Sequence, residues 1–128
     1  MNYDFTRIGV EFLNPMQQDM LQQSRRENRL VLLSPTGSGK TLAYLLPLLH
    51  RLDSKKDTLQ ALVIVPSREL AIQTVDVVKR ICQEARVMAC YGGRPAMDEH
   101  RQINGLRPHL IIATPGRILD QPSIFMEV

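Results

Sequence analysis

The residues best suited to chemistry form the glycine-rich run Ser34-Pro35-Thr36-Gly37-Ser38-Gly39-Lys40-Thr41, which lies between an apolar run and a helical pattern. In such a loop, backbone N–H groups wrap a phosphate, and the N-terminus of the next helix adds partial positive charge. We expect the ammonium group of Lys40 to lie beside the outer phosphates of a nucleotide, and the Thr41 hydroxyl to coordinate a bridging Mg²⁺. An ordinary glycine-containing turn is the alternative. The loop by itself selects no reaction, because several classes of nucleotide-binding protein share it.

Composition places the chain among single-domain proteins. It has 128 residues, of which 44% are hydrophobic, enough to build one core but not two domains. The net charge of +3 is compatible with an anionic partner, but it is common among proteins that bind none. The two cysteines, Cys82 and Cys90, lie in no metal-ligand spacing, so we expect buried thiols in a reducing compartment.

Neither a membrane span nor a signal peptide is predicted. No stretch approaches the roughly eighteen uninterrupted apolar residues that cross a bilayer. The first ten residues carry Asp4 and Arg7 where a signal peptide has an apolar core. We therefore expect a cytoplasmic protein without membrane contact.

Apolar runs and helical patterns alternate along the chain. Short apolar runs predict strands at 30–33, 62–65, 87–91 and 110–113. Helices are predicted after Asn14, after Lys40, after Ser67 and over 97–104. This alternation predicts an α/β fold, with a mainly parallel sheet between two helical layers. Ligands of such sheets bind at the C-terminal strand ends, and the glycine-rich and charged clusters of this chain follow strand ends.

Taken in order, these clusters resemble the motifs in the N-terminal RecA-like domain of DEAD-box ATP-dependent RNA helicases. Leu13-Asn14-Pro15-Met16-Gln17 resembles the glutamine motif of that family. The resemblance implies that Gln17 hydrogen-bonds the adenine edge and selects ATP over GTP; a glutamine on a surface helix is the alternative. The glycine-rich loop corresponds to motif I, which implies ATP and Mg²⁺ as cofactors.

Three further segments resemble the RNA-binding motifs of the family. Pro66, Ser67 and Arg68 open a run similar to motif Ia, with serine in place of the usual threonine. Gly92 and Gly93 resemble the paired-glycine motif, and Thr114, Pro115, Gly116 and Arg117 resemble motif Ib. The resemblance implies contacts to the RNA sugar-phosphate backbone, which carry no base specificity. Each segment alone is more typical of a cap or a turn than of an RNA contact, whereas their order is specific.

The resemblance is incomplete. The sequence holds no Asp-Glu-Ala-Asp tetrapeptide, no Ser-Ala-Thr motif and no second RecA-like domain. In the family, these parts hold Mg²⁺, orient the attacking water and stabilise the transition state. We therefore expect residues 1–128 to be part of the N-terminal ATP-binding domain, able to bind but not to hydrolyse ATP. The family also has an upstream aromatic residue that stacks on adenine, for which Phe5 is the candidate. Residues 121–128 match no recognised motif and are expected to form a tail.

The resemblance also predicts an incomplete sheet. In the family, two strands that this sequence lacks lie between the phosphate-loop strand and the motif Ia strand. Without them, strand edges and apolar faces would be exposed. We therefore expect the sheet to rearrange, or the chain to associate or exchange elements with a second copy.

Three functions follow as hypotheses. The first is the ATP-binding and RNA-binding part of a DEAD-box helicase, whose intact form couples ATP hydrolysis to local RNA unwinding with a second RecA-like domain. The second is a non-catalytic nucleic-acid-binding or interaction module. The third is an unrelated phosphate-loop kinase or transport NTPase, which the order of the motifs disfavours.

Overall fold

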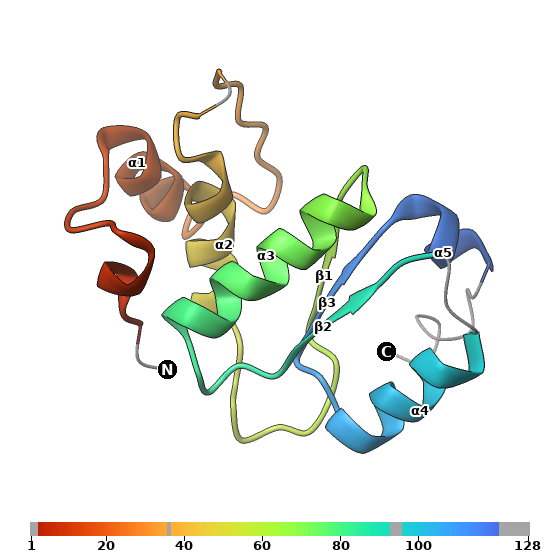
Figure 1. The fold of residues 1–128 in the computed structure, drawn as a ribbon. Helices are drawn as coiled ribbons and strands as arrows, with labels where there is room; N and C mark the ends of the chain where they lie inside the picture. The colour runs from red at the N-terminus through yellow and green to blue at the C-terminus, as the bar shows by residue number, and fades with distance from the viewer. Residues whose placement is uncertain (1–2, 36, 93–95, 121–128) are drawn as a thin grey trace.

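The structure is a computed structural model that describes residues 3–35, 37–92 and 96–120. Helices and strands alternate along most of the chain (Figure 1). The elements are the 3-10 helix η1 (Phe5–Ile8), α1 (Pro15–Gln23), α2 (Lys40–His50), β1 (Ala61–Ile64), α3 (Arg68–Ile81), β2 (Val87–Cys90), α4 (Ala96–Leu106), β3 (Leu110–Ala113) and α5 (Pro115–Asp120).

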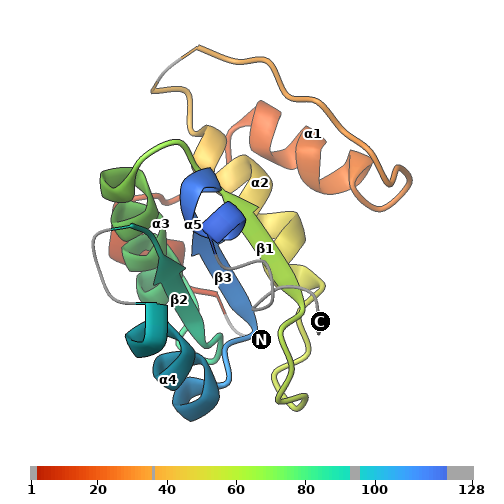
Figure 2. The same cartoon turned by 90° about the vertical axis from the view of Figure 1, so that its right-hand side faces the viewer.

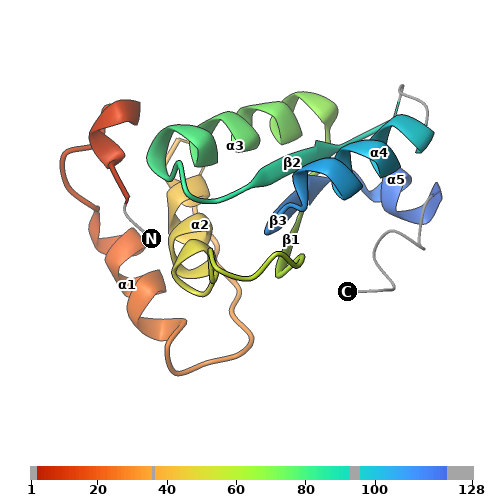
Figure 3. The same ribbon diagram turned by 90° about the horizontal axis from the view of Figure 1, so that it is seen from below.

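The described strands form one parallel sheet in the order β1-β3-β2 (Figure 2). Helix α3 connects β1 to β2, and helix α4 connects β2 to β3. Parallel strands need crossover connections of this kind. Helix α1 packs against α2, on the side of α2 that faces away from the sheet (Figure 3). The expected α/β fold with a parallel sheet is confirmed.

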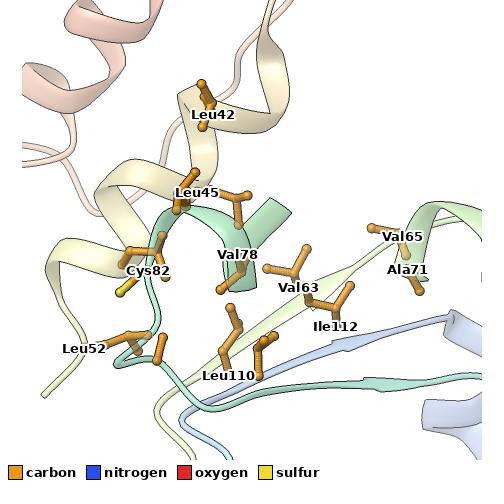
Figure 4. Packing of buried hydrophobic residues seen from close by; sticks show 14 residues of the cluster. Leu42, Leu45, Leu52, Val63, Val65, Ala71, Val78, Cys82, Leu110 and Ile112 are labelled. Carbon is orange, nitrogen blue, oxygen red and sulfur yellow. The ribbon is translucent and has the colours of Figure 1, made fainter. Parts of the chain in front are cut away.

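Two apolar clusters cover the two faces of the sheet. The larger one joins α2 and α3 to one face, where Leu45, Val78 and Ile112 are buried (Figure 4). The smaller one lies on the other face, where Ile103 of α4 and Ile118 of α5 pack against Met88, Cys90, Ile111 and Ala113. Cys82 is buried in the larger cluster and Cys90 in the smaller one, and both are reduced, as expected of buried thiols.

The prediction of a strand at 30–33 is wrong. This segment has no strand assignment, and Val31 and Leu33 are 87% and 90% exposed. An apolar run predicts that a segment is suited to burial, but a strand also needs a partner along its backbone. Among the described strands, β1 pairs only with β3, so the segment at 30–33 has no neighbour in the sheet.

The strand predicted at 110–113 is confirmed with the same bounds as β3, whereas other boundaries differ by one or two residues. β1 begins and ends one residue earlier than predicted, β2 stops at Cys90, and α4 extends from Ala96 to Leu106. On α3, the polar side chain of Thr74 is buried, and its hydroxyl donates to the Leu70 carbonyl (2.7 Å) in place of water. Among the described residues, no helix is both long and apolar enough to cross a membrane.

Candidate nucleotide and RNA site

The start of α1 is hydrogen-bonded to the glycine-rich loop. Asn14 caps the helix and, with Gln17, forms a capping box that satisfies the backbone N–H of both residues (2.9 and 2.8 Å). The Asn14 side-chain amide donates to the Ser38 carbonyl (2.9 Å), and the Gln17 amide donates to the Gly39 carbonyl (3.1 Å). Gln17 is only 4% exposed. The two motifs, which are separate in the sequence, are therefore in direct contact, and this contact was not predicted.

Gly39 is the residue that allows this close approach. Its φ is +91°, in the left-handed region, and a Cβ there would lie 2.5 Å from Nε2 of Gln17. A side chain would therefore collide with Gln17 and strain the backbone. Only glycine fits at this position.

The first turn of α2 is suited to an anion. Gly39 is its N-cap, and among the described residues no side chain caps the helix and no acidic residue lies in its first turn. The N–H groups of this turn have no intrahelical acceptor, and the helix dipole favours negative charge there. Lys40 and Thr41 open the helix and are half-buried. Contact of their side chains with a phosphate or with Mg²⁺ stays a prediction.

Hydroxyl groups close the loop that precedes α2. The Ser34 and Ser38 hydroxyls hydrogen-bond to each other, and the Ser38 hydroxyl donates to the Pro35 carbonyl (2.6 Å). Gly37 has a φ of +82°, which only glycine adopts without strain. Thr36 lies outside the described residues. Among the described residues, no cluster of His, Cys, Asp and Glu suits a metal ion, so Thr41 stays the one predicted Mg²⁺ ligand.

Phe5 is packed into the protein. Its ring stacks with that of Tyr3 (centroids 6.3 Å apart), which in turn stacks with His50 (4.9 Å) at the C-terminal end of α2. Phe5 also packs against the larger apolar cluster. These contacts give the ring a structural role and argue against the predicted stacking on adenine.

The segments expected to bind RNA lie together at the C-terminal end of the sheet. Pro66 follows β1, Gly92 follows β2 and Thr114 follows β3. Hydrogen bonds join the segments there, from Val65 N to Ala113 O (2.9 Å) and from Thr114 N to Cys90 O (3.0 Å). The Ser67 hydroxyl caps α3 by accepting from Leu70 N (3.2 Å), as its alternative interpretation predicts. Pro115 and Gly116 begin α5 and are exposed, whereas Gly93 lies outside the described residues.

The two arginines that were expected to contact RNA differ in their exposure to solvent. Arg68 is exposed, and its guanidinium lies 5.7 Å from the centroid of the Tyr91 ring. Arg117 is only 6% exposed, forms an ion pair with the fully buried Glu99, and donates from Nε to the Tyr91 carbonyl (3.2 Å). Contact between Arg117 and RNA remains a prediction, and this burial argues against it. Sequence reasoning missed Tyr91 and Glu99, since neither lies in a recognised motif.

The sequence and the fold of this chain are similar to those of known proteins. The DEAD/DEAH box helicase family matches residues 14–126. The ATP-dependent RNA helicase CshA of Listeria monocytogenes is 40% identical over 118 residues, which cover 89% of this chain and 22% of that protein. The DEAD-box ATP-dependent RNA helicase CshA of Geobacillus kaustophilus is 38% identical over 118 residues, which cover 89% of this chain and 25% of that protein.

Two solved structures resemble the fold, each with a TM-score of 0.76 and 28% identity over 94% of this chain. One is the DEAD-box helicase Mss116 bound to single-stranded RNA and UDP-BeF, of which this chain covers 26%. The other is a hypothetical ATP-dependent RNA helicase from Sulfolobus tokodaii, of which it covers 35%. These matches support the predicted RecA-like architecture. The chain belongs to the DEAD/DEAH box helicase family, and it spans about a fifth to a quarter of the length of the curated relatives named above.

Proposed function

We propose that this chain is the ATP-binding and RNA-backbone-binding portion of a DEAD-box ATP-dependent RNA helicase. The observation that carries the proposal is the pair of hydrogen bonds from Asn14 and Gln17 to the carbonyls of Ser38 and Gly39. They place a candidate adenine-binding amide directly beside a candidate phosphate loop. A nucleotide in this site would have its base near α1 and its phosphates at the start of α2.

Each residue of the site has a distinct task in this proposal. Gln17 binds adenine with the second N–H of its amide and the free lone pair of its oxygen. The ammonium group of Lys40 and the first-turn N–H groups of α2 hold the phosphates, and the Thr41 hydroxyl helps to hold Mg²⁺. When bound, Mg²⁺ supplies positive charge that offsets the charge of the phosphate oxygens.

The proposed RNA contacts lie at the C-terminal end of the sheet. The exposed guanidinium of Arg68 suits a phosphate, and the Thr114 hydroxyl suits a phosphate or ribose oxygen. The backbone at Gly92 is exposed and has no side chain to hinder a strand of RNA. Such contacts are electrostatic and independent of base sequence, so binding should weaken steeply with added salt.

We further propose that ATP hydrolysis belongs to the intact helicase and not to these 128 residues alone. Phosphoryl transfer depends on placed charges around the γ-phosphate, and the sequence holds no Asp-Glu-Ala-Asp carboxylates. In the intact enzyme, a second RecA-like domain would complete the site, and its closure over ATP and RNA would separate a short duplex.

Calorimetric titration of the 128-residue chain with MgATP, and separately with MgGTP, tests the nucleotide site. We expect MgATP to bind more tightly than MgGTP, because the amide of Gln17 matches the adenine edge and not the guanine edge. Replacement Gln17→Ala should remove this preference. Binding of both nucleotides with equal affinity by the unaltered chain would contradict the role of Gln17. If the chain binds RNA in a salt-dependent way but binds neither nucleotide, it acts as a non-catalytic RNA-binding module.

The backbone groups along the outer edge of β1 lead us to expect self-association of the chain. Ala61 and Val65 direct their N–H groups to β3, so the intervening Leu62 and Ile64 direct theirs to the outer edge. Ile64 is 58% exposed. A cleft of about 350 Å³, which Leu30, Tyr44 and Leu62 help to line, separates this edge from the segment that precedes the phosphate loop. Unpaired edges of this kind pair readily with another chain.

We expect light scattering to show a dimer or larger assembly of the 128-residue chain. Replacement Ile64→Lys should shift it toward the monomer, because a lysine on an edge strand opposes pairing. Ile72→Lys is the matched control, since Ile72 is exposed on α3, away from this edge. A monodisperse monomer of the unaltered chain would contradict the prediction.

A further inference from the structure

The buried side chain of Arg117 connects segments from three parts of the sequence. Its Nε donates to the Tyr91 carbonyl at the end of β2 (3.2 Å) and pairs with the Glu99 carboxylate of α4. Glu99 is 0% exposed and lies in the first turn of α4, whereas Arg117 belongs to α5. One guanidinium therefore joins the end of a strand to two helices.

Tyr91 extends this connection to a fourth segment. While its carbonyl accepts from Arg117, its ring faces the guanidinium of Arg68 at the start of α3, 5.7 Å from the ring centroid. A cation over an aromatic face is attracted by the electron density of the ring. These contacts run from Arg68 through Tyr91 and Arg117 to Glu99. They thus connect the three segments that are proposed to contact RNA.

We propose that Glu99 and Arg117 are positioning residues for the RNA-binding edge, and that Arg117 makes no phosphate contact of its own. This inference rests on the proposed RNA-binding function of the edge and assigns the pair a task within it. The pair holds Tyr91 and the following Gly92 in place, and the Tyr91 ring then orients the Arg68 guanidinium toward a phosphate.

Burial and charge both favour this assignment over direct contact. Arg117 is only 6% exposed, so a phosphate contact would require its guanidinium to move toward solvent and would weaken its pairing with the fully buried Glu99 carboxylate. Such a rearrangement is strongly unfavourable in a protein interior. Arg68 is exposed and meets no such obstacle.

The two roles predict opposite effects of Glu99→Gln on RNA affinity. If Arg117 contacts phosphate, removing the competing carboxylate should leave affinity unchanged or raise it, because one negative charge is lost near RNA. If the pair positions the edge, affinity should fall, on the order of 2- to 30-fold for a residue that acts through a contiguous network. Asp98→Asn is the matched control, since it removes the same charge from an exposed side chain on the same helix turn.

The experiment titrates labelled single-stranded oligouridine with the 128-residue chain and its Glu99→Gln, Asp98→Asn and Arg68→Ala variants over a series of salt concentrations. Arg68→Ala should lower the slope of log affinity against log salt by about 0.7, the value for one lost contact to a single strand. Glu99→Gln should lower affinity at every salt concentration without changing that slope. Unfolding curves for each variant confirm that affinity is compared between folded proteins.

Amide hydrogen exchange provides a readout that does not involve RNA. In Glu99→Gln we expect faster exchange at Thr114 and Ile118, whose N–H groups donate to Cys90 and Thr114 carbonyls within the edge (3.0 and 3.3 Å). Asp98→Asn should leave both rates unchanged. Unchanged exchange in Glu99→Gln, or RNA affinity that is equal to or higher than that of the unaltered chain, would overturn the positioning role. If the unaltered chain binds no RNA, the proposed function fails, and positioning of the edge is decided by exchange alone.

Discussion

Replacement Lys40→Ala is expected to weaken MgATP binding by about 1.5–3 kcal/mol, on the order of 10- to 100-fold, the usual contribution of a hydrogen bond to a charged group. The reason is positional: Lys40 is the first residue of α2, immediately after the left-handed Gly39. Its ammonium group and the helix N-terminus would act on the same phosphates. Calorimetric titration of the variant with MgATP measures the loss.

Lys56→Ala is the control for this experiment. It removes the same charge from an exposed position in the connection between α2 and β1, so nucleotide affinity should not change. The fold of Lys40→Ala should persist, because Lys40 is half-buried and lies outside both apolar clusters. Equal affinity of Lys40→Ala and the unaltered chain would refute the assignment of the phosphate loop.

Replacement Glu99→Ala is expected to lower the free energy of unfolding by about 3–5 kcal/mol, the range for breaking a buried ion pair from one side. The variant leaves the buried Arg117 guanidinium without its counter-charge. Chemical denaturation monitored by circular dichroism measures the change. The double replacement Glu99→Leu with Arg117→Met should recover much of the loss, because two apolar side chains need no partner.

An exposed pair on the same protein provides the comparison. Asp76 and Arg80 lie one turn apart on α3 at 2.9 Å, with both side chains more than half exposed. Asp76→Ala should cost about 0.5 kcal/mol or less, because solvent screens surface pairs and their geometry is not enforced. Similar losses for Glu99→Ala and Asp76→Ala would show that burial does not strengthen the Glu99–Arg117 pair.

Local sequence signals predict much of the fold. Asn14 before Pro15 and Ser67 before a run with Glu69 both cap helices, because their side-chain oxygens accept from first-turn N–H groups at short range. The glycine-rich loop precedes α2 for a similar reason, since its glycines adopt conformations that other residues avoid. These signals depend only on neighbouring residues, so a single sequence is enough to find them.

Features that depend on residues distant in the sequence could not be predicted. The residues at 30–33 have the composition of a buried strand, but pairing depends on which other strands are present, and composition does not encode that. Arg117 illustrates the same limit at the site. Its sequence context predicts an RNA contact, whereas its burial depends on Glu99, which follows a different strand. The contact from Gln17 to Gly39 was also missed, because the fold alone brings the two segments together.

The placement of the two cysteines gives each face of the sheet its own chemical reporter. Cys82 lies under α2 and α3, whereas Cys90 ends β2 on the opposite face and precedes Tyr91. A thiol shielded from solvent reacts with a disulfide reagent only when its surroundings open, so the rate of modification measures the free energy of that opening. In the Cys90→Ser and Cys82→Ser variants only one thiol remains, so its rate of modification reports the opening of one face alone. Movements at the C-terminal end of the sheet, where RNA is proposed to bind, could then be distinguished from unfolding of the larger core, without any label being introduced.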